Sequence, residues 1–155
     1  MTSSMDTSIL SRFQALCSRS EQCSADILRK LLKTFEGDES KAQEVLDTLK
    51  ADKFVDDARY AAAFARDKAR LEGWGPLKIR FKLRGKGISD ADIEAGLGQV
   101  DADEAEEKLY RLVLARRKTL DGDPQIKLKL LKYALGRGYS YDQVAPAVDK
   151  ALIDG

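Results

Sequence analysis

Five basic residues alternate with apolar ones between residues 77 and 86. This spacing suggests that the stretch binds an anionic partner. Ammonium and guanidinium groups at this density can contact the phosphates of a nucleic acid or the carboxylates of an acidic protein surface. The alternative is a solvated amphipathic face, neutralised by residues 89–107, which hold eight carboxylates and no cation. Both interpretations stay open at this point. The five cations are Lys78, Arg80, Lys82, Arg84 and Lys86.

Side chains that carry out catalysis are scarce. The sequence has no histidine, which removes the commonest general base and the commonest metal ligand. Its two cysteines, Cys17 and Cys23, lack the partners of a zinc site, and we expect both to be reduced thiols. Adjacent Asp56 and Asp57 point in different directions on a helix, so we expect one of them to cap a helix N-terminus. No enzymatic activity, metal or cofactor is expected.

Length and composition describe a single globular domain with separated charges. The chain has 155 residues, a net charge of +1 and 34% charged residues. No stretch approaches the roughly 18 apolar residues that suggest a membrane span, and the first residues lack the pattern of a signal peptide. We therefore expect a cytoplasmic protein that does not enter a membrane, and we expect residues 1–8 to be flexible.

The elements that position these residues read as helices. Apolar residues recur at helical spacing, as in Ile27, Leu31 and Phe35, while Val, Ile and Thr are sparse. Pro76, Pro124 and Pro146 suit the first turns of helices, and Gly87 suits a left-handed position after a helix. The expected N-terminal caps are Asp38, Asp56 or Asp57, Ser89, and Ser140 with Gln143.

An internal repeat supports the helical interpretation. A shift of 51 residues places "LRGKGISDADIEAGL" on "ALGRGYSYDQVAPAV", and a shift of 48 reveals a weaker third copy. The counterpart of the alternating stretch, "IKLKLLKYALGRGYS", does not alternate, which indicates that both are helices. The sequence predicts an all-α, elongated array of tandem three-helix repeats with about nine helices. The expected repeats span residues 9–55, 56–104 and 105–155.

The segment "FVDDARYAAAFARDKARLEGWGPLKIRFKLRGKGIS" resembles the core signature of the RecX recombination regulators. In that family a phenylalanine precedes an Asp–Asp pair and an Arg–aromatic–Ala run. A turn with Gly and Pro follows, and then a basic helix that ends in Lys-Gly-Ile. The matching positions are Phe54, Asp56, Asp57, Arg59, Tyr60, Ala61, Gly75, Pro76, Ile79, Leu83, Lys86, Gly87 and Ile88.

The resemblance implies a monomeric regulator of DNA repair, recombination and the SOS response. Such a protein would bind the RecA recombinase or its nucleoprotein filament and inhibit filament growth and strand exchange. The alternative is a helical module that binds nucleic acid directly, although the near-neutral net charge argues against tight, unaided DNA binding. Trp74 would then stack on a base, whereas we favour its sealing a junction between repeats. The expected partner-binding residues are Arg59, Arg66, Arg70, Lys78, Arg80, Lys82, Arg84 and Lys86.

Overall fold

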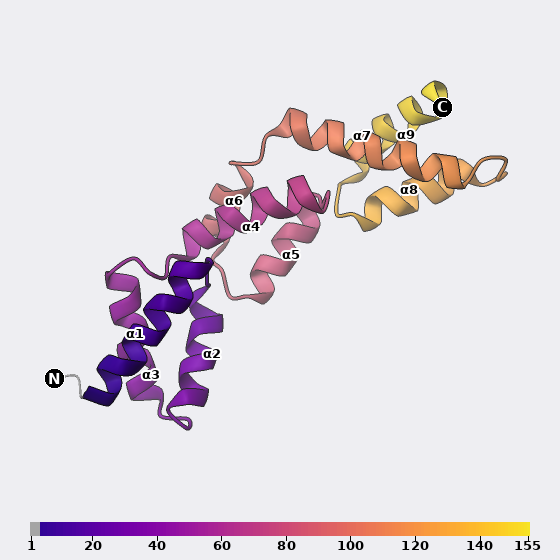
Figure 1. Cartoon of the computed structure of the whole chain (residues 1–155). Helices are drawn as coiled ribbons and strands as arrows, with labels where there is room; N and C mark the ends of the chain where they lie inside the picture. Colours follow the sequence, from indigo (N-terminus) through magenta and orange to yellow (C-terminus); the bar gives the residue numbers. More distant parts are fainter. Residues whose placement is uncertain (1–3) are drawn as a thin grey trace.

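The computed structural model describes residues 4–155, which form nine α-helices and no strand (Figure 1). The first three residues of the segment expected to be flexible lie outside the described residues, and α1 begins at Ser4. No helix in the described part of the chain has the length and apolar composition to cross a membrane. The helices are α1 Ser4–Arg19, α2 Ser24–Thr34, α3 Glu39–Ala51, α4 Asp57–Leu71, α5 Pro76–Gly85, α6 Asp90–Leu97, α7 Ala102–Thr119, α8 Ile126–Gly136 and α9 Tyr141–Asp154.

The helices begin where short polar side chains cap them. Asp38, Asp56 and Ser89 each accept a hydrogen bond from the backbone N–H three residues further on, which satisfies one of the free donors of a helix start. Ser140 and Gln143 form a capping box at the start of α9. These predicted caps are therefore confirmed.

Proline and glycine positions follow the prediction with two exceptions, Pro146 and Pro124. Pro146 lies inside α9 as its sixth residue and not in the first turn. Pro76 is the first residue of α5, and Gly87 lies just beyond the end of that helix with a φ of +75°. The placement of Pro124 in the first turn of a helix is wrong. Asp123 and Pro124 form a turn instead, in which the Asp123 carboxylate accepts the N–H of Gln125, and α8 starts only at Ile126.

Three successive groups of three helices each pack around a core of their own. The first repeat is α1–α3, the central repeat is α4–α6 and the third repeat is α7–α9. Figure 1 shows the three repeats following one another in an elongated array, with the two chain ends at opposite extremes. The predicted all-α array of tandem three-helix repeats is confirmed. The exact boundaries stay a prediction: 55/56 falls between α3 and α4, and 104/105 falls within α7.

The stretch that alternates in sequence is α5. Its inward side is formed by Ile79 and Leu83, which are 1% and 0% exposed. The other i,i+4 pair, Leu77 and Phe81, faces solvent and is 50% and 73% exposed. The helix thus buries one apolar pair in the central repeat and presents the second one on its surface.

The central and third repeats meet through backbone atoms at a glycine junction, formed by residues 75–77 and 137–139. The N–H of Gly75 donates to the carbonyl of Arg137 over 2.7 Å, and the N–H of Leu77 donates to the carbonyl of Gly138 over 2.9 Å. A Cβ atom on Gly75 would lie 2.5 Å from the backbone nitrogen of Tyr139 and closer still to Gly138. Only glycine therefore allows this approach.

The first and central repeats meet through side chains. The N–H of Ser24, at the start of α2, donates to the Asp57 carboxylate over 2.8 Å. Cys23, the residue before α2, is fully buried within the core of the central repeat. Both α2 and α5 therefore have a free N–H of their first turn satisfied by the repeat that follows.

Candidate partner-binding surface

Helix α4 carries three of the expected contact residues on one face, because Arg59, Arg66 and Arg70 are seven and four residues apart. All three also contact neighbours within the chain. Arg59 pairs with Glu21 of the first repeat at 2.7 Å, and Arg66 donates to the side-chain carbonyl of Gln99 over 2.6 Å. The remaining one, Arg70, lies 3.6 Å from Glu104.

A groove of about 380 Å³ separates α4 from α7 and includes two of these arginines. The third repeat adds Lys108 and Arg111, which the sequence analysis did not identify. The segment "EKLYRLVLARRK" at 107–118 matches "DARYAAAFARDK" at 57–68, a shift of 50 residues, and both cations fall there on alanines, so the internal repeat gave no signal for them. Asp101, Glu104 and Glu107 also line this groove, so its cations are partly neutralised.

Two cations of α5 face the acidic helix that follows it. Arg80 donates to Glu94 over 2.7 Å, and Arg84 lies 3.0 Å from Asp90. The hydrogen bond from Arg80 holds the pKa of Glu94 below its ordinary value. The acidic segment therefore neutralises these two arginines, and they serve first to hold α5 against α6.

Lys86 reaches across to the first repeat. Its ammonium group donates to the Asp26 carboxylate over 3.0 Å. Burial alone would raise the pKa of Asp26, but the hydrogen bonds from Lys86 and Cys23 outweigh it and hold that pKa below its ordinary value. This lysine is thus part of the contact between the first and central repeats.

The remaining cations of α5 are Lys82, which is exposed, and Lys78, which is half-buried beside Gly138. Together with two exposed apolar side chains they form what we call the α5 outer face: Leu77, Lys78, Phe81 and Lys82. Within the described residues Lys82 forms no ion pair, while the Lys78 ammonium lies 4.5 Å from the centre of the Trp74 ring. Leu77 and Phe81 form an exposed apolar pair beside these lysines, and an exposed apolar patch rimmed by polar side chains marks a surface that binds another protein. Sequence reasoning missed Phe81, although Lys132 at the matching position in the second copy indicated that this position is exposed.

Trp74 lies beside the glycine junction and is half-buried. Its ring packs edge-on against Phe64, with 6.1 Å between ring centres, and the Lys68 ammonium lies 4.9 Å from its centre. No group of Cys, Asp or Glu side chains in the described ranges has the geometry of a metal site.

Comparison with known proteins places these features in a family. The model of "RecX, second three-helix domain" matches residues 56–97, which contain α4–α6. "Regulatory protein RecX" of Clostridium botulinum (strain Eklund 17B / Type B) is 36% identical over 121 residues, covering 74% of this chain and 55% of the relative. The same-named protein of Clostridium acetobutylicum is 33% identical over 125 residues, with coverages of 76% and 56%.

Solved structures agree with these matches. The structure described as "Crystal structure of regulatory protein RecX" superposes with a TM-score of 0.80 at 27% identity, covering 93% of this chain and 71% of the other. RecX from Lactobacillus salivarius, at 23% identity and a TM-score of 0.76, shows the shared fold. The chain spans about half the length of the curated relatives that it matches. Because the central repeat matches the family model and the array of three-helix units is shared with the solved structures, the chain belongs to the RecX family of regulatory proteins.

Proposed function

We propose that this chain binds the RecA recombinase or its nucleoprotein filament and inhibits filament growth and strand exchange, and so regulates DNA repair and recombination. Membership of a family of regulatory proteins supports this role. An elongated array offers a long surface, which suits binding along a filament better than enclosing a substrate. The role requires no turnover, so we propose a cytoplasmic, monomeric protein that is not an enzyme and needs no cofactor.

The observation that carries the proposal is the α5 outer face. It lies in the repeat that the family model matches, and it combines an exposed aromatic ring with lysines that no carboxylate of the described residues neutralises. In the proposed complex Phe81 enters an apolar pocket of the recombinase, and Lys78 and Lys82 meet acidic groups around it. Arg80, Arg84 and Lys86 act indirectly, by holding α5 in place.

Direct binding to nucleic acid is the second candidate. The groove between α4 and α7 favours it, because Arg66, Arg70, Lys108 and Arg111 are four cations against three carboxylates. Phosphate binding by such a groove would weaken steeply as the salt concentration rises.

The first experiment compares binding to three targets at matched salt: free single-stranded DNA, recombinase alone, and recombinase assembled on that DNA. We expect strong binding to the recombinase, alone or on DNA, and weak binding to bare DNA. Equal binding to bare DNA and to the filament would refute the protein-directed role and support the nucleic-acid module.

Two variants then test the α5 outer face. Phe81→Ser and Lys82→Glu are each expected to weaken recombinase binding, about tenfold or more for Phe81→Ser. Both should melt like the parent protein, because these side chains are exposed. The matched controls are Ile153→Ser, which removes an apolar side chain that is 82% exposed on α9, and Lys132→Glu on α8. Equal losses in variants and controls would rule out a specific role for this face.

A further inference from the structure

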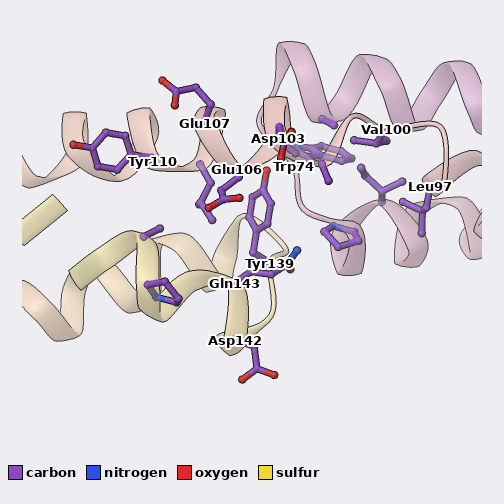
Figure 2. A pocket seen from close by; sticks show the side chains of 18 of the residues that line it. Trp74, Leu97, Val100, Asp103, Glu106, Glu107, Tyr110, Tyr139, Asp142 and Gln143 are labelled. Atoms are coloured by element: carbon purple, nitrogen blue, oxygen red, sulfur yellow. The ribbon is translucent and has the colours of Figure 1, made fainter. Parts of the chain in front are cut away.

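A cavity of about 700 Å³ lies between the central and third repeats, and the role of the α5 outer face does not use it (Figure 2). Its two walls differ in chemistry. The wall from the central repeat is entirely apolar. It is formed by Ala69, Trp74, Pro76, Ile79, Leu97 and Val100.

The opposite wall, from the third repeat, is acidic. Asp103, Glu106 and Glu107 of α7 and Asp142 of α9 line it, against one cation, Lys150. Figure 2 shows Asp103 and Glu106 turned toward the cavity, whereas Glu107 and Asp142 point away from it. Neither Asp103 nor Glu106 forms an ion pair with any described residue. Two carboxylates beside an apolar surface attract a cation and repel an anion.

Tyr139 supplies a separate indication that the cavity receives a ligand. Its side chain lines the cavity and is 3% exposed, yet its hydroxyl group has no hydrogen-bond partner in the described structure. Figure 2 shows the ring standing between the walls, with the hydroxyl end on the side of Asp103 and Trp74. An unpartnered buried hydroxyl is costly, and a ligand that supplies an N–H donor would satisfy it.

The shape of the cavity suits a peptide segment. On one side it follows α7 from Asp103 to Tyr110, and on the other it follows α9 from Asp142 to Lys150. Two turns of helix measure about 11 Å, which matches three or four residues of an extended chain or two turns of a bound helix. Among the described residues, the one cation of the cavity lies at the end formed by Tyr110. There the Lys150 ammonium is 4.4 Å from the centre of the Tyr110 ring.

We propose that this cavity, the junction cleft, binds a basic amphipathic segment of a partner protein. Apolar side chains of that segment contact the wall of the central repeat. A lysine or arginine lies between Asp103 and Glu106 and donates to the Tyr139 oxygen. This proposal does not rest on the proposed binding to the recombinase. Binding of a basic segment tests the junction cleft, whereas binding of the recombinase tests the α5 outer face.

The test uses a short capped peptide with lysines on one helical face and leucines on the other. Trp74 is the only tryptophan in the sequence and forms part of the cleft wall, so its fluorescence reports occupancy. We expect saturable binding that weakens with added salt. We expect no binding of a peptide with glutamate in place of lysine, or of one with serine in place of leucine.

Variants of the cleft identify the site. Asp103→Asn and Glu106→Gln should each weaken peptide binding about two- to fivefold, and Tyr139→Phe should weaken it about two- to tenfold. Free Tyr139→Phe protein should melt at the same temperature or higher, because it loses an unsatisfied hydroxyl. Glu39→Gln, an exposed first-turn carboxylate of α3, is the matched control and should bind like the parent.

Four results would overturn the proposal. The first is no saturable binding of the lysine peptide, and the second is equal binding of the glutamate peptide. The third is binding that the cleft variants leave unchanged. The fourth is self-association of the protein without peptide, removed by Glu106→Gln and by Phe81→Ser, which would assign the cleft to the α5 outer face of a second copy instead of a partner protein.

Discussion

Replacement of Gly75 by alanine is the sharpest test of how the central and third repeats are joined. The φ of Gly75 is −85°, which any residue adopts, so the substitution adds no backbone strain of its own. Its effect is steric, because the new Cβ would lie 2.5 Å from the nitrogen of Tyr139, and real Cβ contacts are essentially never below 3.0 Å. The three nearest atoms that it meets all belong to the backbone, so the rotation of a side chain cannot relieve this clash.

The expected magnitude follows from the bonds that must open. Residues 75–77 can make room only by moving away from residues 137–139, which breaks the two hydrogen bonds of the glycine junction. At about 0.5–1.5 kcal/mol for each bond, Gly75→Ala should lower the free energy of unfolding by about 1–3 kcal/mol. For a chain of this size that corresponds to a melting temperature lower by about 2–12 °C.

Thermal unfolding followed by circular dichroism measures the loss, and amide hydrogen exchange locates it at Gly75 and Leu77. The matched control is Gly85→Ala at the other end of α5, where no atom lies within 4 Å of the added Cβ. This control should be as stable as the parent, or more stable by about 0.5–1 kcal/mol, because alanine favours a helix over glycine. The glycine junction would be refuted if Gly75→Ala and Gly85→Ala were equally stable and the amides of residues 75 and 77 stayed protected from exchange.

Three further measurements test other contacts. Asp57→Ala should lower the free energy of urea unfolding by about 0.5–2 kcal/mol because the N–H of Ser24 loses its acceptor, whereas Asp57→Asn keeps an acceptor and should lose less. The pKa of Asp26 is lowered in the folded protein, so this carboxylate contributes to stability above about pH 4. That contribution is lost as the pH falls through the lowered pKa. In urea unfolding, Asp26→Asn should therefore lack this part of the loss of stability in acid. Burial raises the pKa of the Cys17 and Cys23 thiols, so both should react with a thiol reagent only after denaturation, and fast reaction of the native protein would contradict their buried positions.

Local features of the fold were predictable from the sequence. Helix caps such as Ser89 and Asp38 act on backbone groups three residues away, so a short window contains the whole interaction. The repeat also allowed one copy to be interpreted from another. It resolved the alternating stretch around Phe81 as a helix, because its counterpart around Lys132 does not alternate.

Which residue each cation contacts was not predictable in the same way. Arg80, Arg84 and Lys82 look alike in the sequence, and their partners depend on which side of α5 meets α6. Contacts between repeats join residues far apart in the chain, such as Lys86 and Asp26, which are 60 positions apart. No periodicity marks such a pair. The same holds for the junction cleft, whose walls come from two repeats.

The capping of α2 and α5 by later repeats affects how the chain folds during synthesis. The ribosome releases Ser24 well before Asp57, which is 33 positions further on, and Leu77 well before Gly138. Each of these helices therefore leaves the exit tunnel with a free first turn that only later residues can complete. The nascent array consolidates in steps, in which every newly folded repeat stabilises the one made before it.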